Sequence, residues 1–204
     1  MGRLILTGAT LTDGTGAEPV RDRAVVIERG RIGAVLRGRR EGDATELALD
    51  GLTLLPGLIN CHVHFCLGGE ADPARVLFED PVAIRTIKAV LRAKQTIEAG
   101  VTTVRDLGGV DGIALAIRDA VSAGLIPGPR VLAAARGICM TGGHGWRFGR
   151  EADGPDDVRK AVREQLKAGA DVIKLFATSS IRDGGGQTMS DAQIQAACSE
   201  APRS

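Results

Sequence analysis

The sequence predicts an α/β protein: about four βα units of a TIM-type (β/α)8 barrel, preceded by a small β-sandwich-like domain. Two observations predict this fold. From Pro56 onward, apolar segments of strand length alternate with amphipathic segments of helix length, which is typical of parallel βα units. Before Pro56, short segments rich in β-branched residues are separated by turns. No GxGxxG pattern follows a strand, so a dinucleotide-binding sheet is disfavoured.

The N-terminal domain is expected to span residues 1–55 and to be incomplete. Its strand candidates are "RLILTG", "AVVIERGRIGAVL" and "ELALDGLTLLPG", and "ERGR" lies where a hairpin would turn. The barrel portion is expected to span residues 56–204. A complete barrel needs eight units and about 250 residues. The 204-residue chain is therefore expected to contain the N-terminal half of a barrel.

Each predicted strand of the barrel portion precedes a predicted helix. The strands are expected at 57–65, 102–107, 130–135 and 172–177. The helices are expected at 81–99, 112–123, 155–168 and 190–201. Ser190 is a suitable N-cap for the last helix, and glycines follow the other three, at Gly100, Gly124 and Gly169.

Composition excludes several classes of function. The net charge is +1 and the aromatic content is 2%, which gives no basis for binding nucleic acid or an anionic membrane. No apolar run approaches the roughly 20 residues of a membrane span, and the N-terminus does not resemble a signal peptide. The four cysteines, Cys61, Cys66, Cys139 and Cys198, show no disulfide framework. We expect a cytoplasmic protein with reduced thiols.

Two histidines, His62 and His64, follow an apolar run in "LPGLINCHVHF". Residues two apart in a strand point to the same face, so the two imidazoles are expected to lie together at the carboxyl end of the first barrel strand. Such a pair suits a divalent metal. The alternative is two incidental polar residues solvated by water. A zinc finger built on "CHVHFC" is disfavoured, because strand geometry turns Cys61 to the opposite face.

Lys174 lies in "DVIKLFATSS", a segment typical of a buried parallel strand. An isolated ammonium there is costly, so the lysine must shift its pKa, find a partner or be modified. One interpretation is that it extends to the strand end or pairs with a carboxylate. The other is that neutral Lys174 reacts with carbon dioxide, which gives a carbamate able to bridge two metals.

Four motifs, in the order "LPGLINCHVHF", "GVTTVRDLGG", "TGGHGW" and "DVIKLFATSS", resemble the metal-dependent amidohydrolase superfamily, and within it the imidazolonepropionase-like and Xaa-Pro dipeptidase-like branch. The resemblance extends over essentially the whole chain. It implies that His62, His64 and carboxylated Lys174 bind metal, two ions in the complete protein, and that a metal-bound hydroxide attacks an amide-type carbonyl. Zinc is favoured, while manganese, iron and cobalt stay admissible.

The resemblance assigns roles to other residues. His144, on a glycine-rich loop, is expected to orient the substrate carbonyl, the alternative being an exposed loop histidine. Trp146 is expected to pack over the substrate or to anchor the loop. Arg105 and Asp106 match the family pattern and are expected to form a buried ion pair. No organic cofactor is expected, and the substrate is a small molecule or a dipeptide.

The sequence departs from the family pattern in one respect. The second-metal histidines and the general-base Asp of the family have no counterpart, because all three histidines of the chain are already assigned. The expected function is hydrolysis of amide-type C–N bonds by a truncated chain. Alternatives are an inactive fragment or assembly half, and a deaminase or imidazolonepropionase-type ring-opening enzyme. Open strand edges predict a homo-oligomer or pairing with a C-terminal half.

Overall fold

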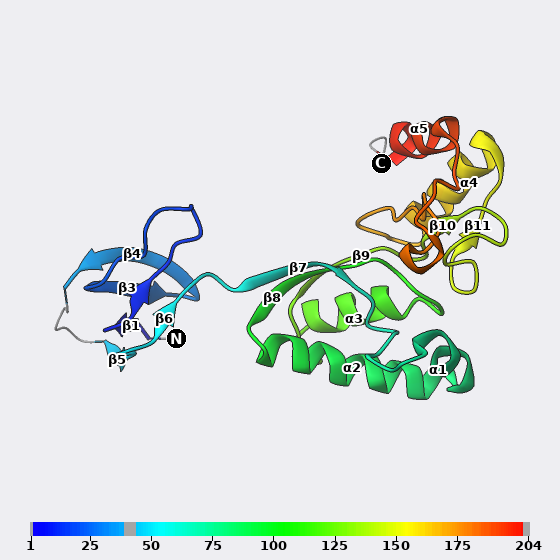
Figure 1. The fold of residues 1–204 in the computed structure, drawn as a ribbon. Coiled ribbons are helices and arrows are strands. Elements are labelled where there is room, and N and C mark those ends of the chain that lie inside the picture. The colour runs from blue at the N-terminus through cyan, green and yellow to red at the C-terminus, as the bar shows by residue number, and fades with distance from the viewer. Residues whose placement is uncertain (1, 39–43, 202–204) are drawn as a thin grey trace. The chain divides into compact units, whose positions relative to one another are not determined.

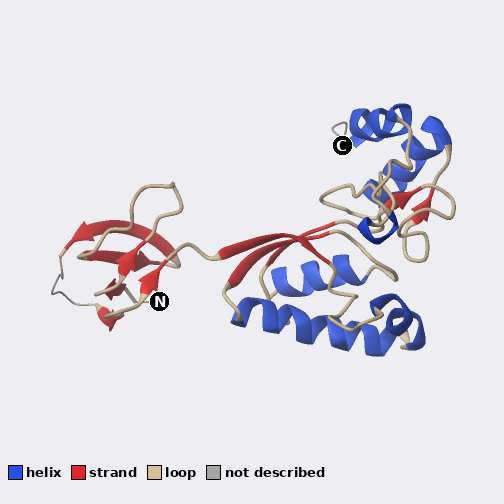
Figure 2. Cartoon of the chain, viewed as in Figure 1, coloured by secondary structure: helices blue, strands red, loops and turns tan. Residues whose placement is uncertain are grey.

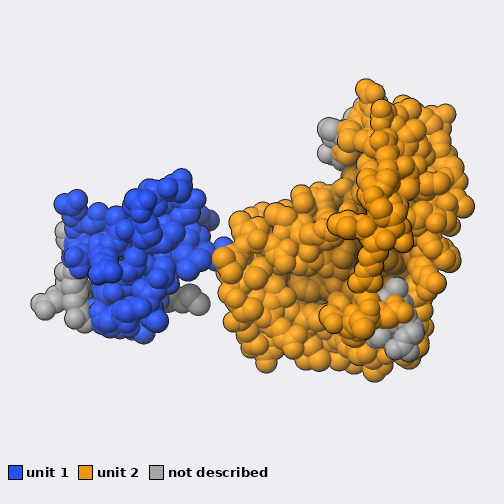
Figure 3. Space-filling model, viewed as in Figure 1, with its two compact units in different colours: residues 1–57 blue, residues 58–204 orange. Residues whose placement is uncertain are grey.

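The computed structural model describes residues 2–38 and 44–201 of the chain. The chain divides into two compact units, residues 1–57 and residues 58–204 (Figure 3). Within the described residues, no helix combines the length and the apolar character that a membrane span requires.

The first unit is built on a four-stranded sheet of order β4-β3-β1-β5 (Figure 1). Its strands are β1 (Leu4–Thr7), β3 (Arg23–Glu28), β4 (Arg31–Arg37) and β5 (Thr45–Ala48). Strand β3 pairs antiparallel with β1 and β4, whereas β5 runs parallel to β1. A second, two-stranded sheet joins β2 (Thr10–Leu11) and β6 (Thr53–Leu54). Ile5, Ala24 and Val26 form the core of this unit.

The turn between β3 and β4 confirms the hairpin predicted at "ERGR". Glu28 pairs with Arg31 across the turn, and the two central residues, Arg29 and Gly30, have φ of 51° and 74°. Positive φ at both positions defines the tight turn whose twist matches that of the flanking strands.

The second unit begins with a parallel three-stranded sheet of order β7-β8-β9. Its strands are β7 (Leu58–Val63), β8 (Val101–Asp106) and β9 (Arg130–Ala133). The helices α1 (Pro73–Glu79), α2 (Val82–Glu98) and α3 (Ile113–Ser122) lie on one side of this sheet (Figure 2). The buried side chains between the layers form one cluster that includes Leu77, Ala89, Ala93, Val104, Ile113, Ile117 and Val131.

A second core lies around α4 (Gly154–Lys167) and α5 (Asp191–Glu200). It contains Ile138, Ala152, Val158, Ala161, Val162, Met189 and Ala197. Two short parallel strands, β10 (Ile138–Cys139) and β11 (Arg150–Glu151), and the 3-10 helix η1 (Ile181–Asp183) complete this region. Ser190 caps α5 through a reciprocal bond with Gln193, as its sequence position predicts.

The prediction of a fourth strand at 172–177 is wrong, because the segment does not form a regular strand. The segment pairs at a single point, where Leu175 bridges Ile138 in parallel orientation. Ile138 donates to the carbonyl of Lys174 at 2.8 Å, and Phe176 donates back to Ile138 at 2.8 Å. The reason is that the segment beside it offers too short a strand to pair with. Strand β9 ends at Ala133, and only the two residues of β10 are extended after it. The sheets of the described residues are therefore open, and none closes into a barrel.

Candidate metal centre

The parallel register brings the ends of three strands to one edge of the sheet. Val63 of β7 pairs with Asp106 of β8, and Asp106 pairs with Ala133 of β9. The residues that follow these positions therefore lie together at the carboxyl edge, where parallel α/β sheets place their functional side chains.

His62 and His64 lie at this edge. His62 belongs to β7, and His64 follows the last residue of the strand. Their ring centroids are 5.4 Å apart, so the two imidazoles converge as the period of the strand predicts. His62 is exposed and His64 is partly buried.

His64 has a defined hydrogen-bond partner. Its Nδ1 lies 2.7 Å from the carbonyl oxygen of Gly108, and since a carbonyl can only accept, Nδ1 carries the proton. Burial lowers the pKa of His64, the hydrogen bond to Gly108 opposes this shift, and the charges of His62 and Lys174 lower the pKa further. The ring is therefore neutral near pH 7, with a lone pair on Nε2.

Lys174 influences both imidazoles. Burial lowers the pKa of His62, and the charges of Lys174 and Arg105 add to the effect. The pKa of Lys174 is itself lowered, first by burial and then by the charge of Arg105. Its Nζ lies 4.9 Å from the ring centroid of Phe176. The three predicted ligands therefore lie within electrostatic reach of one another, although Lys174 comes from an irregular segment.

The loop 140–149 carries His144, which is exposed. The His144 ring lies 5.2 Å from that of Phe176, centroid to centroid. Phe148, on the same loop, lies 6.1 Å from the ring of His64 and 5.6 Å from that of Phe176. The loop thus contacts both the end of β7 and the Lys174 segment through aromatic rings.

A cavity of about 580 Å³ opens over this loop. Its lining includes His144, Trp146, Arg147, Ser179 and Thr188. Trp146 is half exposed, and the guanidinium of Arg147 lies 5.5 Å from its ring centroid. A hydroxyl of this lining, Oγ1 of Thr188, is buried without a hydrogen-bond partner among the described residues.

The ion pair predicted between Arg105 and Asp106 is wrong. Successive residues of β8 point to opposite faces, so Arg105 is exposed and its Nε donates to the carbonyl of Cys61 at 2.9 Å. Asp106 is fully buried and accepts instead from the backbone N–H groups of Phe65 and Gly108. Burial raises its pKa to about 6, and these two hydrogen bonds offset only part of the shift.

The sequence profile of the amidohydrolase family matches residues 53–203. The chain belongs to the amidohydrolase family. This confirms the resemblance inferred from the four motifs. Among curated proteins, the ochratoxinase of Aspergillus niger is 30% identical over 217 residues, which cover 87% of this chain and 42% of that protein.

Solved structures of the amidohydrolase family are similar along the chain. A Xaa-Pro dipeptidase with methionine bound in its active site gives a TM-score of 0.85 at 27% identity, covering 98% of this chain and 54% of that one. The A. niger ochratoxinase gives a TM-score of 0.82 at 25% identity, covering 99% of this chain and 53% of that one. The chain therefore spans about half the length of these relatives.

The residues at the edge of the sheet fit the divalent metal that the amidohydrolase family implies. Neutral imidazoles are metal ligands, and ligating histidines commonly donate their second ring N–H to a backbone carbonyl, as His64 does to Gly108. Within the described residues, no group of three or more His, Cys, Asp and Glu side chains is placed to hold a metal. Lys174, whose charge acts on both imidazoles, is the further candidate ligand that the sequence predicts here.

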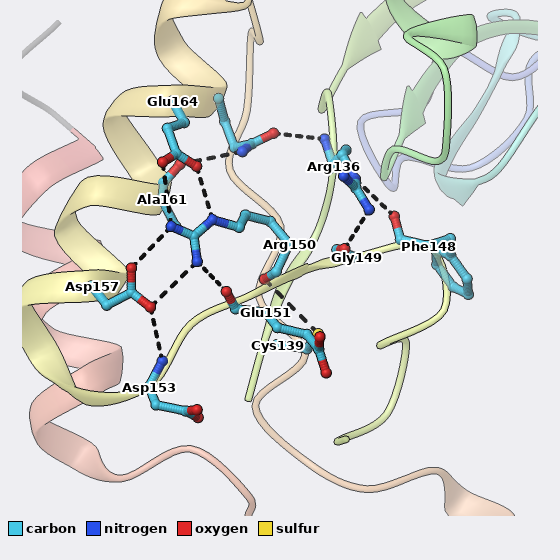
Figure 4. A network of polar contacts seen from close by, with 11 residues as sticks. Arg136, Cys139, Phe148, Gly149, Arg150, Glu151, Asp153, Asp157, Ala161 and Glu164 are labelled. Carbon is cyan, nitrogen blue, oxygen red and sulfur yellow. Dashed lines mark hydrogen bonds and ion pairs between the residues drawn. The ribbon is translucent and has the colours of Figure 1, made fainter. Parts of the chain in front are cut away.

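Sequence reasoning missed the arginines that hold the loop 140–149. Arg136 donates to the carbonyls of Phe148 and Gly149, at 3.2 and 2.6 Å. Arg150 lies between Asp157 and Glu164 of α4 and also bonds the carbonyl of Glu151 (Figure 4). No local pattern marks these residues, because their side chains bond to partners as far as 14 positions away and the N–H of Arg136 bonds to Gln165, 29 positions away.

Proposed function

We propose that the chain supplies half of the active site of a metal-dependent hydrolase that cleaves amide-type C–N bonds, with His62, His64 and carboxylated Lys174 as metal ligands. The observation that carries the proposal is the convergence of two neutral imidazoles beside a lysine with a lowered pKa. A divalent cation held there, with zinc favoured, would supply the Lewis acidity that amide hydrolysis requires.

Carboxylation gives Lys174 the chemistry of a ligand. The neutral amine attacks the carbon of CO2, the new N–C bond forms as one C=O π pair moves onto oxygen, and the nitrogen releases one proton to water, which leaves an anionic carbamate with two oxygen donors. Burial and the nearby Arg105 both favour the neutral amine that this reaction needs. The charge of the carbamate would also be attracted to the exposed Arg105 guanidinium.

The loop 140–149 is the proposed substrate-binding wall. His144 is exposed at the cavity of about 580 Å³, where its imidazole can orient the substrate carbonyl. Arg147 and Trp146 line the same cavity and offer a cation and an aromatic face to the rest of the substrate. A dipeptide or another small amide fits this chemistry, and the name of one relative, a Xaa-Pro dipeptidase, favours peptide bonds over ring opening.

We infer that the second unit forms half of a (β/α)8 barrel and that the first unit is part of a β-sandwich. The parallel order β7-β8-β9 is the arrangement that successive barrel strands adopt. The chain that follows α4 runs beside the end of β9 and beside β10, through the bond from Asp171 to the carbonyl of Ala133 and the parallel bridge between Leu175 and Ile138. The match of 98% of this chain to about half of a dipeptidase of the family supports the same inference.

The metal site is tested by zinc binding to the 204-residue chain. We expect Zn²⁺ to bind one site in calorimetry and to bind more tightly when ¹³C-bicarbonate is present, with a new carbamate resonance in the ¹³C spectrum. Replacement of a ligand, H62N or H64N, should weaken binding by more than the roughly 10- to 100-fold that loss of an outer-shell partner costs. K174R should abolish both the carbamate resonance and the effect of bicarbonate.

Matched controls are available in the same unit. H144N removes the third histidine but no proposed ligand, so zinc affinity should be unchanged. K167R changes a lysine exposed at the end of α4 and should keep the carbamate resonance. The proposal fails if H62N and H64N bind zinc as the unmodified chain does, or if the carbamate resonance survives in K174R.

A further inference from the structure

The carboxylate of Asp106 occupies an unusual position for a charged group. It is 0% exposed, and among the residues that the structure describes it is the only Asp, Glu, Lys, Arg or His side chain in the buried class. The two hydrogen bonds of its carboxylate go to backbone N–H groups, one to each oxygen. Burying a carboxylate is costly unless hydrogen bonds compensate for its lost solvation, so these two bonds are what make this position tolerable.

The two bonds of Asp106 hold both sides of His64. Oδ2 accepts from the N–H of Phe65 at 2.9 Å, and Phe65 directly follows His64. Oδ1 accepts from the N–H of Gly108 at 2.8 Å. The carbonyl oxygen of the same glycine lies 2.7 Å from Nδ1 of His64. One carboxylate thus fixes both the backbone next to the imidazole and the residue whose carbonyl accepts the hydrogen bond of the imidazole.

The turn at Gly108 is held by backbone hydrogen bonds on both sides. Gly108 has φ of +87°, and a Cβ at this position would lie 3.0 Å from the carbonyl oxygen of Ala135. On either side, Leu107 donates to Val63 at 2.9 Å and Gly109 donates to Ala135 at 3.2 Å. These bonds leave the N–H of Gly108 directed at Asp106 and its carbonyl directed at His64.

We propose that Asp106 is a positioning residue that holds the His64 ring in the Nδ1–H tautomer, with the Nε2 lone pair available, by fixing the carbonyl of Gly108 against Nδ1. This statement concerns the metal-free chain. Its consequence for metal affinity rests on the proposed function, because only then does the Nε2 lone pair have a cation to bind.

The tautomer of His64 can be read directly from the ¹⁵N shifts of its ring at pH 8. In the unmodified chain we expect Nδ1 to be protonated and Nε2 to be unprotonated. In D106N one of the two carboxylate oxygens becomes an NH2 group facing an N–H, so one hydrogen bond is lost. The His64 shifts should then move toward the average of both tautomers, while those of exposed His144 stay unchanged.

Asp171→Asn is the matched control. Oδ2 of Asp171 also accepts from a backbone N–H, that of Ala133, at 2.9 Å, and it binds Arg118. This variant therefore loses an equivalent backbone anchor on β9, the strand beside Asp106, while the bonds to Phe65 and Gly108 stay intact, and it should leave the His64 tautomer as it is. If D106N and D171N both lower the unfolding temperature and neither changes His64, the role of Asp106 is only structural and the proposal is overturned.

The proposal does not depend on D106N folding. The unmodified chain alone overturns it if His64 is protonated on Nε2, or if the Gly108 amide exchanges with solvent as fast as an exposed one. Zinc titration separates this proposal from the proposed function. If D106N loses the Nδ1–H tautomer of His64, its zinc binding should be weaker by roughly 10- to 100-fold. Absence of zinc binding by the unmodified chain would refute the metal site and leave the tautomer result standing.

Discussion

At the scale of single residues, Gly108 determines where the carbonyl partner of His64 lies. G108A introduces a side chain at φ of +87° and places its Cβ 3.0 Å from a backbone oxygen. The left-handed conformation costs a non-glycine residue about 1–2 kcal/mol, and the close contact adds to that cost. We expect the free energy of unfolding, measured with urea, to fall by more than the conformational cost alone.

Gly112 provides the comparison for this prediction. It has φ of +68°, and a Cβ there would meet nothing within 4 Å. G112A should therefore show the conformational cost without the contact. Equal destabilisation by G108A and G112A would show that the turn at Gly108 can relax away from Ala135.

The buried carboxylate of Asp106 predicts an unusual pH dependence. Its native pKa is raised to about 6, against about 3.9 in an unfolded chain. Between these values the native state binds more protons, so the contribution of this group to stability falls as pH rises from 4 to 6. Relative to D106N, the unmodified chain should lose roughly 2–3 kcal/mol of unfolding free energy between pH 4 and pH 7. The measurement is urea unfolding of both proteins at pH 4 and pH 7. If the unfolding free energies of the unmodified chain and D106N differ by the same amount at both pH values, the prediction is contradicted.

At the scale of elements, local patterns in the sequence were enough to predict three of the parallel strands. The apolar runs of the sequence coincide with β7, β8 and β9. Of these, β8 and β9 contribute Val104, Val131 and Ala133 to the core, whereas β7 is largely exposed. The helices α2, α3, α4 and α5 also lie where their periodicity and caps predict. The predicted strand at 172–177 is wrong because a strand forms only where it has a partner strand to pair with. In this segment only Leu175 finds such a partner, Ile138 of β10.

The candidate site was predictable only in part. His62 and His64 could be paired from the period of a strand, and the rings do converge. The partner of Asp106 could not be predicted, because the face on which it lies is set by the packing of β8 against the helices. The hydrogen bonds of Arg136 and Arg150 join a loop to other elements, and such contacts leave no local signature.

Arg150 joins α4 to the segment that follows the loop 140–149. Its guanidinium lies 2.9 Å from Asp157 and 2.8 Å from Glu164, measured from N to O, and is only partly exposed. Lysine cannot reproduce this forked geometry. R150K should lower the free energy of unfolding by about 1–2 kcal/mol, the range of hydrogen bonds to charged groups reduced for partial exposure.

R159K, on the same helix, is the control for this prediction. Arg159 pairs with Asp156, whose side chain is fully exposed, and exposed pairs of this spacing contribute about 0.5 kcal/mol or less. Urea unfolding of both variants, at low and at high salt, provides the test. If R150K is no more destabilising than R159K, the network around Arg150 does not hold the loop segment to α4.

At the scale of the whole molecule, the three-stranded sheet has an open edge. In the described part of the chain, β7 pairs only with β8. Its outer edge carries two exposed apolar side chains, those of Leu58 and Ile59, which are 51% and 68% exposed. An apolar edge with unused backbone groups is a template for another strand. If the second unit is half of a barrel, as we propose, the other half of the fold would supply that strand.

The open edge predicts that the 204-residue chain associates through β7, with a second copy or with a separately supplied C-terminal half of the fold. Light scattering should show an average mass that rises with protein concentration. I59K places a charge on the edge, where lysine opposes strand pairing, and should weaken association roughly tenfold, or about 1.4 kcal/mol. L125K is the control, since Leu125 is 77% exposed but lies in the turn after α3. A monomer at every concentration, or equal weakening by both variants, would show that β7 is not the contact.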